Sequence, residues 1–190
     1  LSKLFTLLAS FLWVLTAFYA FGYMKHKERL REFYSFFTVT LAVVLGIAFS
    51  GNLFTLYVYY ELLTLSTLPL VMYNGTEQAL SSGKKYIIYS FSGATLILFG
   101  MMLLYSVTGT MAFTPRGILT QIEASDYSVL LLSYIVMFLG FGVKAALVPF
   151  HSWLPAAMVA PTPVSALLHA VAVVKSGVFS LIRMTYFIFG

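Results

Sequence analysis

The chain alternates between long apolar runs and short polar links. Each apolar run is near the ~20 residues that a helix needs to cross a ~30 Å hydrocarbon core. Backbone groups inside lipid must bond within their own segment, so runs of this length are expected to be helices. The predicted spans are Leu4–Met24, Phe33–Ser50, Leu53–Tyr73, Tyr86–Thr108, Tyr127–Val148 and Val164–Phe189. We therefore expect an all-α fold, a polytopic transmembrane helix bundle of about six spans.

The composition supports a membrane protein and excludes several other classes. Of the 190 residues, 61% are apolar and only 9% are charged, and the mean hydropathy is +0.94. A soluble domain carries roughly a quarter charged residues, so a soluble enzyme or a disordered tail is excluded. The chain has no cysteine, which excludes a disulfide scaffold and any thiolate-bound metal or cluster. We expect no cofactor, no metal site and no nucleic-acid partner.

The basic residues predict the orientation. Loops on the cytoplasmic side of a membrane carry an excess of lysine and arginine. The second link has neither residue, and the fourth has only Arg116. The first and third links carry Lys25, Lys27, Arg29, Arg31, Lys84 and Lys85. We expect a multi-pass protein of a prokaryotic inner or plasma membrane, with the first and third loops cytoplasmic and Leu1 outside. Because a spanning run follows Leu1 almost at once, we interpret the chain as part of a longer protein.

Four ionisable residues lie within predicted spans: Glu61, Lys144, His169 and Lys175. A charge near the bilayer centre costs about 2.5–3.5 kcal/mol on insertion scales, so such residues are functional candidates. Glu61 and Lys175 are central in their spans, too deep to reach the interface. A protonated Glu61 clasping a neighbouring helix is the structural alternative. His169 has a similar alternative, a neutral imidazole bonded to a hydroxyl.

Lys144 lies near the end of the fifth span, where it could also anchor at the interface. Apolar sequence resumes after it, however, and Pro149 removes a backbone donor and clashes with the preceding turn. The sequence therefore predicts that the helix is broken near Pro149, with carbonyls near Lys144 left without intrahelical partners. Such breaks inside membranes line cavities or ion paths.

The run from Gly142 to Pro155, GVKAALVPFHSWLP, resembles the broken seventh helix of the antiporter-like subunits. This family is shared by respiratory complex I, Mrp-type cation/proton antiporters and membrane-bound hydrogenases. The run APTPVSALLHA from Ala160 to Ala170, followed by Lys175-Ser176-Gly177-Val178, strengthens the resemblance. Tyr60-Glu61-Leu62-Leu63 is similar to the family's fifth helix. The resemblance is dense from about Asn52 to Arg183 and vague before it.

The resemblance implies roles for the intramembrane charges. Glu61 and Lys144 would pair directly or through one water, and their separation would let the lysine lose its proton. His169 and Lys175 would carry protons onward from the pair. It also implies that residues 1–32 are a leading helix and a basic cytoplasmic loop. Residues 33–190 would form a single five-helix repeat, with one broken helix and no exit half of a complete path. Ala156 departs from the family, in which many members have an acidic residue.

We therefore expect proton or sodium/proton translocation by an antiporter-like subunit of a multisubunit complex. Its partners would be other membrane subunits, the lipid bilayer, protons and possible sodium ions, and the chain itself would hold no catalytic redox site. Two alternatives belong to other classes: a subunit that holds a quinone, and a passive membrane scaffold. The sequence has no recognisable quinone-pocket motif, and a scaffold could discard its buried charges.

Overall fold

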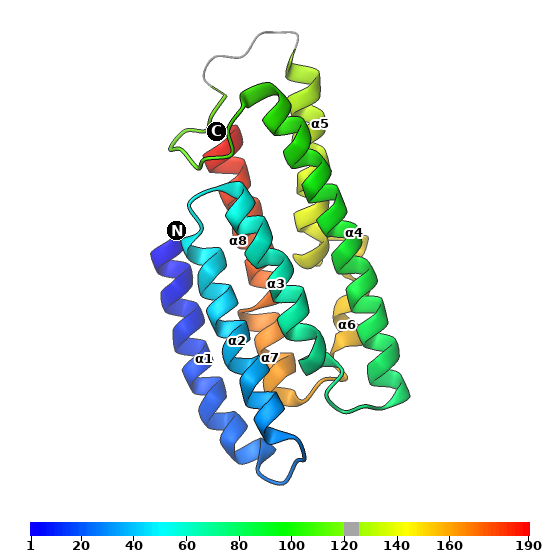
Figure 1. Cartoon of the computed structure of the whole chain (residues 1–190). Coiled ribbons are helices and arrows are strands. Elements are labelled where there is room, and N and C mark those ends of the chain that lie inside the picture. Colours follow the sequence, from blue (N-terminus) through cyan, green and yellow to red (C-terminus); the bar gives the residue numbers. More distant parts are fainter. Residues whose placement is uncertain (120–125) are drawn as a thin grey trace.

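The computed structural model describes residues 1–119 and 126–190, apart from the side chains of His169 and Ala170. Long helices run between the two ends of a bundle (Figure 1). Six helical stretches in the described ranges are long and apolar enough to cross a membrane, which confirms the expected all-α transmembrane fold. The helices are α1 (Ser2–Met24), α2 (Leu30–Phe49), α3 (Leu53–Val71), α4 (Glu77–Thr108), α5 (Tyr127–Lys144), α6 (Trp153–Ala157), α7 (Thr162–Ala170) and α8 (Val173–Met184).

Local sequence sets several helix boundaries. The side chain of Asn52 accepts a hydrogen bond from the amide of Thr55 at 2.7 Å and so caps the start of α3. Thr76 caps α4 in the same way, through the amide of Ala79 at 3.2 Å. These caps satisfy amides that have no partner within the helix. Gly109 ends α4 with a φ of 65°, a left-handed conformation that glycine adopts without a steric penalty.

The fourth span is longer than predicted. Helix α4 begins at Glu77, whereas the sequence predicted a start at Tyr86. The acidic Glu77 in the first turn complements the positive end of the helix dipole, so the helix extends into polar sequence. Lys84 and Lys85 therefore lie within α4, and their assignment to a loop was wrong.

The last span contains an interruption that the sequence analysis missed. Helix α7 ends at Ala170 and α8 begins at Val173, so the expectation of one broken helix was incomplete. Val171 leaves the helical region with φ −139° and ψ −54°. The amide of Ala172 then bonds the carbonyl of Leu167 at 2.8 Å, five residues back instead of four. His169 and Lys175 consequently belong to two different helices.

Helices α4 and α5 approach each other through glycines. A Cβ on Gly140 would lie 2.6 Å from the carbonyl oxygen of Gly93, and a Cβ on Gly93 would lie 2.8 Å from that of Gly140. Further along the same contact, the hydroxyl of Ser133 donates to the carbonyl of Gly100 at 2.8 Å. Close backbone approach and polar contacts of this kind drive helix association in lipid, where apolar burial adds little.

The connections alternate between the two ends of the bundle (Figure 1). The α1–α2, α3–α4 and α6–α7 links lie at one end. Both termini and the α2–α3 link lie at the other end, which we call the terminal end. The first and third links therefore lie at the same end of the bundle and Leu1 lies at the opposite end, as expected from the sequence.

Replacing Gly140 by alanine tests the α4–α5 approach. We expect destabilisation of about 1–3 kcal/mol, because the added carbon meets the backbone of Gly93 and neither helix can shift freely. Gly22→Ala on α1 is the matched control, because a Cβ there meets nothing within 4 Å. The thermal unfolding midpoint of the detergent-solubilised protein is the measurement. A midpoint for Gly140→Ala equal to that of Gly22→Ala would contradict the packing.

Candidate functional site

The fifth span ends inside the bundle, at Lys144. Ala146 follows with a φ of 55°, a left-handed conformation. The amide of Leu147 donates to the carbonyl of Gly142 at 3.0 Å, and the amide of Ala146 donates to that of Val143 at 3.1 Å. These two bonds define a Schellman motif, with alanine at the position that glycine usually occupies.

The break therefore starts earlier than the proline suggested. Pro149 lies in the turn after the motif, ahead of the short helical turn η2 (Phe150–Ser152) and helix α6. The predicted interruption of the span is confirmed, but its first residue is Ala145. Leu147 packs over Gly142, whose missing side chain leaves room for it: a Cβ on Gly142 would lie 3.0 Å from Leu147 Cδ1.

Two aromatic residues satisfy the carbonyls that precede the break. The hydroxyl of Tyr60 on α3 donates to the carbonyl of Phe141 at 3.1 Å. The indole Nε1 of Trp153 on α6 donates to the carbonyl of Val143 at 2.8 Å. Side chains from neighbouring helices thus add a second hydrogen bond to each of these carbonyls, which lipid could not supply. Both carbonyls also accept a backbone amide, that of Ala145 at Phe141 and that of Ala146 at Val143, each at 3.1 Å. The expectation of carbonyls without intrahelical partners is therefore not met at these two positions.

Lys144 is the last residue of α5 and is fully enclosed, with 1% of its side chain exposed. Its Nζ lies 3.3 Å from Oε1 of Glu61 and also donates to the carbonyl oxygen of Tyr60. The same Nζ lies 3.6 Å from the centroid of the Tyr60 ring, a cation–π contact. The negative end of the α5 dipole adds a further favourable field.

Glu61 provides the opposite charge from the middle of α3. Its side chain is 18% exposed, and its second oxygen, Oε2, is buried with no hydrogen-bond partner in the described part of the chain. The direct contact expected between the third and fifth spans is present. An ion pair in a low-dielectric interior balances attraction against desolvation, so loss of one partner is much more costly than loss of both.

Sequence reasoning missed a buried hydroxyl cluster beside the pair. Thr64 and Thr67 continue the α3 face that carries Glu61, and Thr67 Oγ1 lies 2.8 Å from the hydroxyl of Tyr86 on α4. All three residues are buried, and Thr64 Oγ1 has no partner within the described ranges. The signal available in the sequence was the spacing of Thr64 and Thr67, three and six residues after Glu61.

Helix α8 packs directly against the break. A Cβ on Gly177 would lie 2.5 Å from the amide nitrogen of Ala145 and 2.9 Å from the carbonyl carbon of Lys144. Only glycine allows this approach without moving the backbone. The position of Lys144 therefore depends on Gly177, a residue of the helix that also carries Lys175.

The structure does not bring all four predicted site residues together. Lys175 lies in the first turn of α8, and its side chain is exposed on the surface of this chain and not enclosed within it. Gly177 and the buried Ser176 and Ser180 take the inner face of α8, which leaves Lys175 on the outer face. Among the described residues, Lys175 forms no ion pair. His169 lies in the last turn of α7, but its side chain is outside the description.

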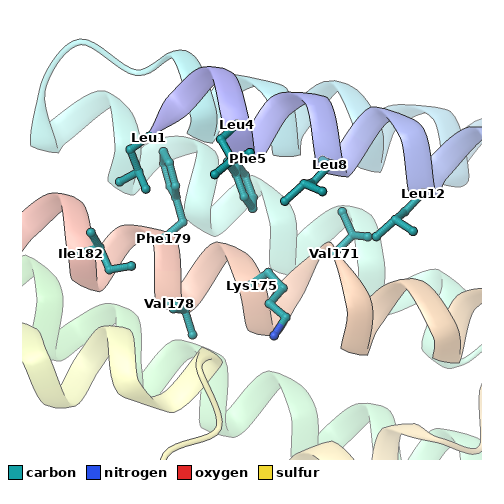
Figure 2. Close-up of a pocket in the computed structure, with 11 residues that line it drawn as sticks. Leu1, Leu4, Phe5, Leu8, Leu12, Val171, Lys175, Val178, Phe179 and Ile182 are labelled. Atoms are coloured by element: carbon teal, nitrogen blue, oxygen red, sulfur yellow. The ribbon is translucent and has the colours of Figure 1, made fainter.

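Lys175 borders an apolar groove between α1 and α8 (Figure 2). The groove has a volume of about 260 Å³ and is lined almost entirely by carbon. In Figure 2 the ammonium points away from the leucines that α1 contributes. The lining residues include Leu4, Phe5, Leu8, Leu12, Val171 and Val178.

Residues 50–190 match the family described as NADH:quinone oxidoreductase/Mrp antiporter, transmembrane. The chain belongs to this family. The matched residues include the Glu61–Lys144 pair, the break, α7 and α8, so the resemblance seen in the sequence is confirmed. Membership in the antiporter family also confirms an integral, multi-pass membrane protein.

Curated relatives of this family member are much longer than 190 residues. A Na(+)/H(+) antiporter subunit of Alkalihalophilus pseudofirmus is 38% identical over 188 residues, covering 97% of this chain and 23% of that protein. The chain thus spans about a quarter of the curated relatives that it matches.

Two solved structures resemble this family member along nearly its whole length. One is the membrane-bound sulfane sulfur reductase, an archaeal respiratory membrane complex, with a TM-score of 0.88 and 28% identity over 98% of this chain and 38% of that one. The other is respiratory complex I from Thermus thermophilus, with a TM-score of 0.76 and 28% identity over 95% and 39% of the two chains. Both relatives are multisubunit membrane complexes.

Gly177→Ala tests whether α8 positions Lys144. The added carbon would push the backbone of Ala145 away, and the Lys144–Glu61 contact would lengthen. We expect the thermal unfolding midpoint of the detergent-solubilised protein to fall, because overpacking against a backbone costs about 1–3 kcal/mol. Gly51→Ala is the control, because a Cβ at Gly51 meets nothing within 4 Å. Equal unfolding midpoints in the two variants would contradict the close approach of α8 to Lys144.

Proposed function

We propose that this chain translocates protons, or exchanges sodium for protons, within an antiporter-like subunit of a larger membrane complex. Three kinds of complex fit the family: an NADH dehydrogenase of the complex I type, an Mrp antiporter and a membrane-bound hydrogenase. The observation that carries the proposal is the Glu61–Lys144 pair at a helix break, enclosed between α3, α5 and α8.

The chemistry of the pair supports this function. While the carboxylate lies beside the ammonium, the attraction between the two charges offsets part of the cost of burying them. When the two side chains separate, Lys144 keeps only the Tyr60 carbonyl and ring as partners, and no carboxylate offsets its charge. A change in the distance between two side chains thus becomes uptake or release of one proton. The break supplies a hinge for that movement, because Lys144 is the last residue of its helix.

His169 and Lys175 complete the proposed path. In this proposal, a proton released by Lys144 passes to the α7–α8 interruption, which separates the two residues. Lys175 then delivers the proton to the outer face of α8, where a neighbouring subunit or a further part of the same subunit takes it up. We also propose the orientation inferred from the sequence, with the α1–α2 and α3–α4 links in the cytoplasm. Residues 33–190 form the five-helix repeat in this scheme, preceded by residues 1–32.

Glu61→Gln tests the proposed role of the pair. Glutamine keeps the size of the side chain but removes the charge that neutralises Lys144, and breaking a buried pair in this way costs about 3–5 kcal/mol. We expect ion flux through the complex in inverted vesicles to fall by at least about tenfold. Glu77→Gln is the matched control, because Glu77 is exposed at the start of α4. Unchanged flux in Glu61→Gln would favour the passive scaffold.

Lys175→Ala and Lys175→Arg test the onward step. Alanine cannot hold a proton, and arginine does not release one in proteins. We expect both variants to assemble but to lose proton uptake in proteoliposomes. Lys84→Ala removes an exposed lysine from the start of α4 and serves as the control. Wild-type uptake by Lys175→Ala would remove this residue from the path.

A further inference from the structure

Two serines on the inner face of α8 are buried without being satisfied. Ser176 and Ser180 are fully enclosed, and neither hydroxyl has a hydrogen-bond partner among the residues that the structure describes. A buried hydroxyl that makes no bond costs free energy. Ordered water is the usual partner of such groups inside proteins.

Other hydroxyls of this chain behave differently. Ser92 and Thr95 on the exposed face of α4 each donate to the carbonyl four residues back, at 2.8 Å in both cases. A helix therefore offers a serine an internal acceptor when nothing else is available. Ser176 and Ser180 leave this acceptor unused and point their hydroxyls into the interior.

Ser176 lies level with the break, and Ser180 lies one turn nearer the terminal end of the bundle. Gly177, beside Ser176, is packed against Lys144 and Ala145. From there α8 rises toward the terminal end, next to the α2–α3 link (Figure 1). Ser180 follows Ser176 by one turn, about 6 Å along the axis, a separation that a single bridging water spans.

Arg183 lies at the upper end of this line, one turn beyond Ser180. Its Nη1 donates to the carbonyl of Ala48 at 3.3 Å and lies 3.5 Å from the hydroxyl of Ser50, at the end of α2. Its guanidinium carbon lies 4.1 Å from the centroid of the Phe113 ring, in the link between α4 and α5. The charge is thus fixed at the point where α2, α8 and that link meet.

We propose that Ser176 and Ser180 bind water in a hydrated branch that leads from Lys144 toward the terminal end, and that Arg183 closes this branch to protons and cations. A fixed arginine repels cations and a hydrated proton alike, and pores use such charges as barriers. The branch deepens the proposed function and rests on it. A pump needs a barrier of this kind, because an open branch would let protons flow back past the ion pair.

The first experiment measures passive leak. The assembled complex carrying Arg183→Gln is reconstituted into vesicles loaded with a pH-sensitive dye, and a potassium diffusion potential drives protons inward. We expect a leak about tenfold or more above wild type, from the loss of a unit charge within about 10 Å of the path. Arg183→Lys keeps the charge and should stay tight. Arg116→Gln removes an exposed arginine of the α4–α5 link and should also stay tight.

A second set of variants distinguishes a leak through the proposed branch from a leak caused by a loosened structure. Arg183→Gln combined with Ser176→Ala and Ser180→Ala should lose most of the leak, because the water sites are gone. The matched control combines Arg183→Gln with Ser92→Ala and Thr95→Val, which should keep the leak. A leak that persists without the two serines, or no leak in Arg183→Gln, would overturn the proposal. The assay measures passive proton leak and does not require active transport. Its result therefore tests the branch even if Glu61→Gln leaves transport unchanged.

Direct observation of water covers the case in which Arg183→Gln does not assemble. In a cryo-EM map of the wild-type complex that resolves ordered water in the same subunit, we expect density within hydrogen-bond distance of both hydroxyls. An empty or side-chain-filled interior at Ser176 and Ser180 in such a map would overturn the proposal.

Discussion

Ending a helix inside a bilayer exposes carbonyl groups that lipid cannot bind, and the architecture of this chain follows from the hydrogen bonds that the last carbonyls of α5 accept. Tyr60 and Trp153 bind the carbonyls of Phe141 and Val143 from two different helices. These bonds fix α3 and α6 against the end of α5. Because Glu61 directly follows Tyr60, the bond that closes the break also brings the carboxylate to Lys144. The contacts that bind the carbonyls at the break therefore also position the ion pair.

Close backbone packing supplies the rest of the constraint. Gly93 and Gly140 hold α4 against α5 above the break, and Gly177 holds α8 against the break itself. None of these positions has room for a Cβ, so small shifts of α8 must be transmitted to the backbone at Lys144. Lys144, at the end of α5, contacts Gly177 of α8 through its backbone and Tyr60 of α3 through its side chain. Movement of either helix can therefore shift Lys144.

Hydropathy and charge were sufficient to predict six spans, the ionisable candidates and a break near Pro149, because each depends on local sequence and the cost of burial. The bounds of the fourth span and the interruption of the last one were not predicted. The start of the break at Ala145 was not predictable, since an alanine in the left-handed conformation gives no local signal. The interruption at Val171 was missed for a similar reason: it lies in an unbroken apolar run. The outward direction of Lys175 depends on which face of α8 meets α5, and this is a tertiary property.

Lys144 and Lys175 occupy comparable depths but have opposite environments. Lys144 is neutralised within the chain, by Glu61, whereas Lys175 has no acidic partner among the described residues. Lys175 is near the centre of the last span, Thr162–Phe189. A lysine facing lipid at that depth costs about 2.5–3.5 kcal/mol. The outer face of α8 is thus better suited to contact with protein or enclosed water than with lipid. In the proposed path, Lys175 would be neutralised from outside the described residues, and its charge would depend on the state of the neighbour that receives the proton.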